Sequence, residues 1–198
     1  MKIMNSLRTF ALSTVMAVPL LAAPVASQTV KQDTFEYSIP ASGTSDKNKL
    51  VGAPSADIII AGVKHKAAIV VDLSKNVLYK YDSDGNPQTA YLVASGKKST
   101  PTHTGVRIVT HTETYPYKTA PAKSKRRRAP RDYGPKIICL NKVDVKTGEQ
   151  SPTGEFIHGN NNPNSIGKYA SHGCIRMDNE VIKQLSQQVK RGDIVIIK

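Results

Sequence analysis

The chain has 198 residues, enough for one domain with a buried core. Beyond the N-terminal region no stretch is apolar enough to span a bilayer, which excludes a protein with several membrane spans. The formal net charge is +13, so attraction to anionic surfaces is expected. No nucleic-acid-binding motif is visible, and a nucleic-acid partner is therefore not expected.

Residues 1–27 have the layout of a secretory signal peptide. Lys2 and Arg8 give a positive start, residues 10–25 are apolar and uncharged, and small residues follow up to Ser27. An uncleaved membrane anchor is the alternative, because the apolar stretch approaches spanning length. Cleavage would lower the formal net charge from +13 to +11. We expect an exported protein of the periplasm or cell wall, with no membrane span in the mature chain.

Residues 28–56 are predicted to form an irregular N-terminal arm, because they are rich in Ser, Thr, Lys, Gly and Pro and show no clear periodicity. One domain is predicted over residues 57–198. It opens with short apolar or alternating runs between turn residues, at 58–60, 67–71, 77–81 and 89–94. Such runs predict a meander of β-hairpins. A pair of buried helices is the alternative, and the β-branched content argues against it.

Residues 112–134 form an unusual basic segment. Its cationic residues are Lys123, Lys125, Arg126, Arg127, Arg128 and Arg131. A run of like charges is usually a solvated, mobile loop, which we predict here. The alternative is a lid, because a long loop inside a compact domain often covers a binding cleft. Either form would attract anionic wall or envelope material.

The remaining pattern predicts further strands and a helix near the C-terminus. The strands are expected at 106–111, 137–140, 154–158 and 193–198. Asp178 or Asn179 is a suitable helix N-cap. The apolar residues that then fall on one helical face are Val181, Ile182, Leu185 and Val189. Gly192 suits the end of this helix.

The residues that carry chemistry concentrate in 171–177, Ser-His-Gly-Cys-Ile-Arg-Met, and in the preceding His158. Cys174 is the candidate nucleophile, and it needs a base or a cationic neighbour to form a thiolate. A zinc site of His158, His172 and Cys174 is the rival interpretation. No Cys-x-x-Cys or His-Glu-x-x-His spacing supports it, so neither a metal nor a cofactor is expected.

The second cysteine, Cys139, lies in the apolar run 135–140 and is expected to be a buried, inert thiol. We therefore predict no disulfide with Cys174, even in an oxidising compartment. The other histidines have no partner at motif spacing and are expected to be ordinary surface or loop residues. They are His65, His103 and His111.

Residues 171–177, preceded by Phe-Ile-His-Gly at 156–159, closely resemble the catalytic signature of the L,D-transpeptidase (YkuD-type) domain. The resemblance covers roughly residues 66–198. It implies a mainly β, β-sandwich-like catalytic fold with at least one α-helix near the C-terminus. Residues 99–105 resemble the family's Thr-Pro-x-Gly-x-aromatic segment, with Arg107 where an aromatic is usual.

The resemblance also implies the catalytic roles. His158 would be the base, with the Gly159 carbonyl orienting its imidazole, and Cys174 would form a thioester acyl-enzyme. Backbone N–H groups of Gly173 and Cys174 would stabilise the oxyanion. His172 would line the pocket.

Two further residues of the signature, Ser171 and Arg176, would either order the loop or bind a substrate carboxylate. The sequence does not decide between these two roles.

The implied substrate is the peptidoglycan tetrapeptide stem, cleaved before its terminal D-Ala, with transfer to an amine of another stem to give a 3–3 cross-link. Family members are typically sensitive to carbapenems. With water as acceptor the same site would be an L,D-carboxypeptidase, and with a protein lysine it would anchor that protein to the wall. A non-catalytic wall-binding module would instead act through the basic segment alone. A generic exported cysteine protease is the least supported class, because no papain-like motif is visible.

Overall fold

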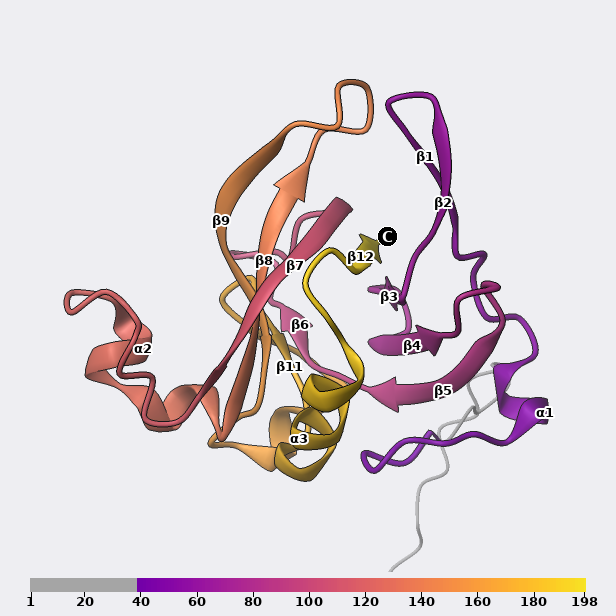
Figure 1. Ribbon diagram of the computed structural model, residues 1–198. Helices are drawn as coiled ribbons and strands as arrows, with labels where there is room; N and C mark the ends of the chain where they lie inside the picture. The colour runs from indigo at the N-terminus through magenta and orange to yellow at the C-terminus, as the bar shows by residue number, and fades with distance from the viewer. Residues whose placement is uncertain (1–38) are drawn as a thin grey trace, which may run out of the picture. The chain divides into compact units, whose positions relative to one another are not determined.

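Strands dominate residues 39–198, the part of the chain that the computed structural model describes (Figure 1). The predicted signal peptide and residues 28–38 of the predicted arm lie outside this range. Among the described residues, no helix is both long and apolar enough to cross a membrane.

The main sheet has eight strands in the order β11-β9-β8-β7-β12-β3-β4-β5, and it is strongly curled (Figure 1). Its strands are β3 (Ile69–Asp72), β4 (Val77–Tyr81), β5 (Pro87–Leu92), β7 (Gly105–Thr114), β8 (Lys136–Val143), β9 (Gln150–His158), β11 (Ile175–Arg176) and β12 (Ile194–Ile197). The pairs β9–β11 and β3–β12 are parallel, and the other neighbours are antiparallel. The predicted mainly β fold is confirmed.

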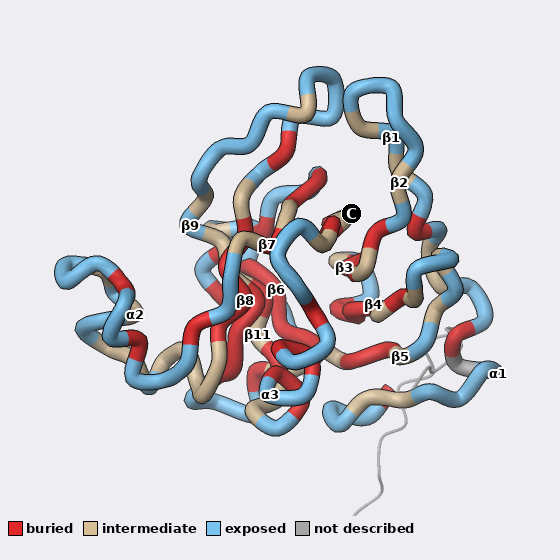
Figure 2. The backbone as a smooth tube through the Cα atoms, in the orientation of Figure 1, coloured by how far each residue is buried: buried red, intermediate tan, exposed pale blue. Residues whose placement is uncertain are grey.

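Both faces of this sheet are buried at its centre, because successive side chains of a strand point to opposite faces. On β3, Ile69 and Val71 join one core and Val70 joins another. Helix α3 (Asn179–Gln188) contributes to the first core and packs against β8. Figure 2 shows buried stretches of β8, β11 and α3 lying together.

Helix α3 begins as predicted. The Asp178 side chain accepts hydrogen bonds from the backbone N–H of Glu180 (2.8 Å) and of Val181 (3.2 Å), which satisfies two of the free donors of the first turn. The predicted apolar face is buried. The helix ends at Gln188, before the predicted Gly192 stop.

Two small sheets complete the strands. One pairs β1 (Asp57–Ile60) with β2 (Val63–Lys66), and the other pairs β6 (Ser95–Gly96) with β10 (Tyr169–Ser171). The predicted meander is confirmed for β3, β4 and β5. It is wrong for residues 58–60, which pair with β2, a strand missed because its Lys-His-Lys residues lack an apolar alternation.

The predicted irregular arm is partly structured. It contains the short helix α1 (Lys47–Leu50), and Thr44 forms an antiparallel bridge with Ala90 of β5. Ile39 and Leu50 are buried in the second core. The described part of the arm therefore packs on the domain.

The basic segment is also packed rather than a solvated loop. Strand β7 runs to Thr114, so the connection to β8 is residues 115–135, which we call the basic cap. It contains α2 (Lys125–Arg128) and the 3-10 helix η1 (Pro130–Tyr133). Tyr117 and Ala120 form a third core with Ile137 and Cys139 of β8. The cap therefore has a buried apolar face, which its run of cationic residues did not indicate.

A buried ion pair joins β7 to β9. Arg107, in place of the family's aromatic residue, is 2% exposed, and its Nε lies 2.7 Å from Glu155 Oε2. Its two terminal nitrogens donate to the carbonyls of Val106 and His103, both at 3.1 Å. Every polar group of this side chain therefore has a partner, as burial of a guanidinium requires.

We predict that Arg107→Met lowers the free energy of unfolding by about 3–5 kcal/mol, because it leaves Glu155 without its cation. Urea unfolding followed by circular dichroism measures this loss. Lys142→Met is the matched control, since Lys142 is exposed directly opposite Arg107 on β8 and should change stability by less than about 0.5 kcal/mol. Equal losses in the two variants would contradict the role of the buried pair.

Candidate active site

The parallel pairing of β9 with β11 brings the predicted site together. Ile175 pairs with Ile157 and Arg176 with His158, so Cys174 precedes β11 beside the end of β9. The backbone continues the contact, because Met177 N–H donates to His158 O at 2.8 Å. The pairing thus places Arg176 beside His158, and His158 and Cys174 line the same cleft.

A pair of asparagines fixes the exit of β9 to the start of α3. Asn179 accepts from the backbone N–H of Asn160 (2.9 Å) and donates to its carbonyl (3.0 Å). Asn160 Nδ2 donates to Met177 O at 2.6 Å. A Cβ on Gly159 would lie 2.4 Å from Asn179 Oδ1, so this position requires glycine for close packing.

His158 is buried, and its protonation is set by its surroundings. Its Nδ1 lies 2.5 Å from Gly159 O. A carbonyl only accepts, so Nδ1 carries the proton and Nε2 is the basic nitrogen. Burial, aided by Arg176, lowers the His158 pKa to about 3, although the Gly159 and Tyr133 backbone carbonyls oppose the shift. The imidazole is therefore neutral at neutral pH.

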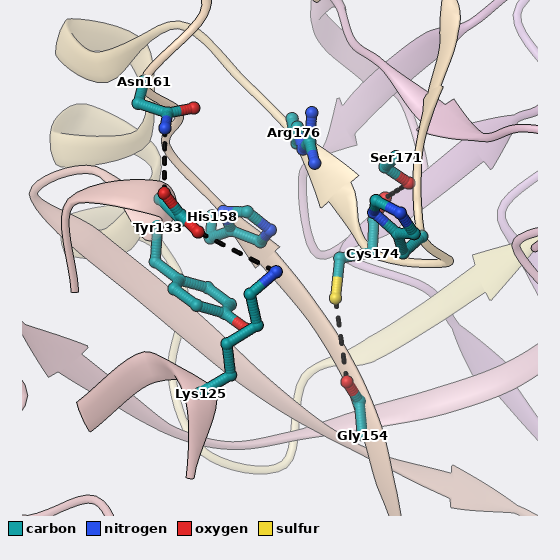
Figure 3. A pocket seen from close by; sticks show the side chains of 10 residues that line it. Lys125, Tyr133, Gly154, His158, Asn161, Ser171, Cys174 and Arg176 are labelled. Carbon is teal, nitrogen blue, oxygen red and sulfur yellow. Dashed lines mark hydrogen bonds and ion pairs between the residues drawn. The ribbon is translucent and has the colours of Figure 1, made fainter. Parts of the chain in front are cut away.

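Cys174 is partly exposed, and its Sγ lies 3.6 Å from Gly154 O (Figure 3). Burial of the sulfur raises the thiol pKa, against the lowering effects of the Phe156 backbone and of Arg176. An imidazolium–thiolate pair would require both groups to be charged in this buried setting. Desolvation disfavours both charges, so the resting pair is thiol and neutral imidazole.

Hydroxyl groups order the loop that carries Cys174. Ser171 Oγ donates to Cys174 O at 2.5 Å and accepts from Gly173 N–H at 3.1 Å. Thr102 Oγ1 donates to Gly173 O at 2.8 Å. Ser171 therefore orders the loop, and Gly173 N–H is directed to Ser171 rather than to a substrate oxyanion, contrary to expectation. Gly173 has a φ of +112°, which glycine adopts readily.

Two clefts adjoin at His172 and Gly154, and Cys174 lines the first of them. A cleft of about 440 Å³ is lined by Cys174, His158, Ser171, His172 and Arg176 together with Lys125, Asp132, Tyr133, Gly154 and Asn161 (Figure 3). A second, of about 470 Å³, shares His172 and Gly154 with the first and is also lined by Gly173, Glu155, Arg107 and His103. The predicted site residues therefore gather around the first cleft, with Gly173 on the second and Gly159 behind the imidazole.

Arg176 faces the first cleft with an unused donor. Its Nε is buried and has no hydrogen-bond partner among the described residues. An unsatisfied buried donor costs free energy unless a ligand uses it. Because Arg176 also lines the cleft, binding of a ligand by this side chain stays a prediction.

The cap supplies cleft residues that sequence reasoning missed. Tyr133 packs against the His158 ring, with ring centroids 4.7 Å apart. Asp132 accepts from Asn161 Nδ2 at 2.9 Å and lies 3.8 Å from Lys125 Nζ (Figure 3). The sequence indicated these residues only through the alternative that the long basic segment forms a lid. No local pattern links residues 115–135 to the motif at 171–177.

A second cluster of polar side chains lies beneath the cap. Ligand atoms of His111, Glu113 and Cys139 lie within 4.8 Å of one another. Cys139 is buried as predicted, and burial raises its pKa to about 12. Arg126 of the cap supplies the cation that Glu113 requires, at 2.9 Å. Both described cysteines are free.

Comparisons with known proteins identify the family of this chain. A family model for the L,D-transpeptidase catalytic domain (YkuD) matches residues 66–197. A protein of Bacillus licheniformis assigned as the L,D-transpeptidase YkuD is 31% identical over 144 residues, which cover 71% of this chain and 73% of the relative. A stretch of 41 residues is 54% identical to the corresponding Bacillus subtilis protein, covering 21% of this chain and 25% of that relative.

Solved structures were also matched. The catalytic domain of the Enterococcus faecium L,D-transpeptidase is 25% identical, with a TM-score of 0.45, over 68% of this chain and 98% of that domain. Bd1075 of Bdellovibrio bacteriovorus is 21% identical, with a TM-score of 0.50, over 73% of this chain and 51% of that chain.

The chain belongs to the L,D-transpeptidase catalytic domain family, whose members are acyl-transfer enzymes with a catalytic cysteine.

We predict that iodoacetamide alkylates Cys174 with an apparent pKa above 9.0, the ordinary value for a thiol. The reason is that burial leaves little thiolate at neutral pH. Stopped-time alkylation of the Cys139→Ala variant, followed by intact mass across a pH series, measures this titration for one thiol. A rate plateau between about pH 5 and pH 7 would instead reveal a stable thiolate–imidazolium pair.

Proposed function

We propose that the protein is an exported cysteine acyltransferase that acts on peptidoglycan tetrapeptide stems and forms 3–3 cross-links. The observation that supports transfer is that Cys174 lines one cleft, while a second cleft shares His172 and Gly154 with the first. A transferase needs room for two substrates beside one nucleophile, whereas hydrolysis needs only water in the second position. The first cleft would hold the acyl donor and the second the acceptor amine.

The chemistry follows from the neutral resting pair. As Cys174 Sγ attacks the carbonyl before the terminal D-Ala, His158 Nε2 takes the thiol proton, so charge develops only when the substrate is present. The resulting imidazolium gives this proton to the departing D-Ala amine as the C–N bond breaks and the thioester remains. In the second half, the acceptor amine attacks the thioester, His158 takes its proton, and Cys174 leaves as the thiol.

The other residues assist this pair. Arg176, with its buried free Nε, would bind a substrate carboxylate, and His172 would line both clefts. Cys174 N–H would contribute to the oxyanion site. Gly173 N–H would join it only if the Ser171 hydroxyl turned away, because that hydroxyl accepts its hydrogen bond. A donor of this kind is typically worth ~10²–10³ in rate.

The same site could perform three reactions, which differ in the molecule that accepts the acyl group from the thioester. Water would give an L,D-carboxypeptidase, and a lysine of an envelope protein would give wall anchoring. Incubation of purified protein with disaccharide-tetrapeptide, followed by mass analysis, separates them. We expect a cross-linked dimer that has lost one D-Ala, and a product mixture containing only tripeptide would replace the transpeptidase proposal with the carboxypeptidase.

We predict that Cys174→Ala abolishes both turnover and the carbapenem adduct, because no other described thiol faces the clefts. His158→Ala should slow carbapenem acylation by at least ~10²-fold, since it removes the general base. His65→Ala is the matched control, because His65 lies on β2, in the separate two-stranded sheet. Intact mass after rapid mixing gives the rates, and a full adduct on Cys174→Ala would disprove the nucleophile assignment.

The exposed cations of the cap would recruit anionic wall material. Two cap arginines already have partners: Arg126 pairs with Glu113 of β7, and Arg127 donates to the carbonyls of Tyr117 (3.3 Å) and Lys118. Lys123, Arg128 and Arg131 remain exposed at its surface. We assign long-range recruitment to these three side chains.

We predict that replacing Lys123, Arg128 and Arg131 with Gln weakens binding to isolated sacculi at low salt. The difference should shrink as salt rises, because screening shortens the reach of these charges to about 8 Å at physiological ionic strength. Pelleting with sacculi over a salt series measures the binding, and carbapenem acylation should be unchanged. Binding that is lowered equally at every salt concentration would contradict electrostatic recruitment.

A further inference from the structure

We propose that Lys125 of the basic cap binds a carboxylate of the peptide acyl donor in the cleft that holds Cys174. This inference rests on the proposed function, which it extends by naming a specificity-determining residue outside the family's catalytic signature. Three observations carry it: the cap is fixed in place, Lys125 points into the cleft, and its ammonium group lacks a close anionic partner.

A buried ion pair anchors the cap beside Lys125. Arg126 donates from Nε to Glu113 Oε2 (2.9 Å) and from Nη2 to Glu113 Oε1 (3.3 Å). Its guanidinium also lies over the Phe156 ring, 5.0 Å from the centroid. The Glu113 side chain is 3% exposed, so this two-point contact is shielded from water. The position of the residue before Arg126 is therefore defined.

The rest of the cap is held from both sides. Tyr117 is buried, and its hydroxyl donates to the carbonyls of Gly134 and Tyr133. Ala129 N–H donates to Lys125 O at 2.7 Å, which closes the turn of α2. Lys125 thus extends from a braced turn and not from a solvated loop.

Lys125 precedes Arg126 on α2, and its side chain lines the first cleft (Figure 3). Its Nζ lies 3.8 Å from Asp132 Oδ2, beyond hydrogen-bond distance, and its side chain is 63% exposed. Such a contact is weak. Asp132 already accepts a hydrogen bond from Asn161. The ammonium is therefore available to a ligand.

The charges around the cleft favour an anion. Lys125 and Arg176 both line it, while Asp132 is its one acidic lining residue. Lys125 also acts on the catalytic pair, because its charge lowers the pKa of both Cys174 and His158. These two pKa effects are consistent with the position of Lys125 in the lining of the cleft.

A stem peptide offers carboxylates of two kinds to this ammonium: the terminal one, on the leaving residue, and those within the stem. A lysine carries a point charge on a flexible side chain, so Lys125 could reach either carboxylate. Arg176 instead presents a planar group. The shared chemistry is a peptide carboxylate, and donors amidated at one position or the other distinguish the two sources.

The test measures equilibrium binding of the tetrapeptide to protein carrying Cys174→Ala, so that no turnover intervenes. The peptides are the free acid, the terminal amide and the internal amides. We expect Lys125→Met to weaken binding of the free acid by roughly tenfold, the effect of one charge-assisted contact. It should leave the affinity for one amidated form unchanged, which identifies the carboxylate. Lys118→Met removes an exposed cap cation that does not line the cleft, and it should leave all affinities within twofold.

The inference is overturned if Lys125→Met preserves the affinity ratio between the free acid and every amidated form. Absence of peptide binding by the Cys174→Ala parent overturns it together with the proposed substrate. Carbapenem labelling of the protein with Cys174 intact separates failure of the inference from failure of the nucleophile, because a β-lactam adduct requires only Cys174 and His158. Melting temperatures equal to the parent's verify that each variant is folded.

Discussion

The parallel pairing of β9 with β11 is the constraint on which the site depends. Only two residue pairs form this ladder, yet they place Arg176 beside His158 and bring Cys174 to the rim of the same cleft. A shift of one residue would turn each side chain to the opposite face of the sheet. Asn160, Asn179 and the loop hydroxyls of Ser171 and Thr102 are best understood as supports for this short ladder, since each bonds a backbone group at one of its ends.

The basic cap completes the cleft from outside the motif. The cations of the cap have different partners. Arg126 forms an ion pair with Glu113, Arg127 donates to backbone carbonyls, and Lys125 lines the cleft. The same segment presses Tyr133 against the imidazole, which deepens the burial that keeps His158 neutral. The cap thus affects the cleft in two ways: Tyr133 contacts the His158 ring, and the charge of Lys125 acts on His158 and Cys174.

The sequence predicted the elements whose signals are local. The β-branched runs of β3, β4 and β8, the Asp178 cap of α3 and the clustered motif all depend on neighbouring residues. It did not predict the packing of the cap, because that depends on Glu113 and on the buried face of β8, which are distant partners of a charge run that appears solvated. Nor could it show that Arg107 is buried, since its acceptor Glu155 lies two strands away in the sheet. The protonation of the catalytic pair likewise follows from burial, which no motif specifies.

The raised pKa of the Cys174 thiol also bears on chemical durability. Oxidants and stray electrophiles react with the thiolate, so a site that holds its sulfur protonated presents them with little target. In the proposed mechanism the thiol loses its proton only when a substrate carbonyl lies against Sγ and His158 accepts that proton. Because oxidation beyond the sulfenic acid is irreversible to thiol reductants, this arrangement would protect the one cysteine that lines the cleft while it waits for a substrate.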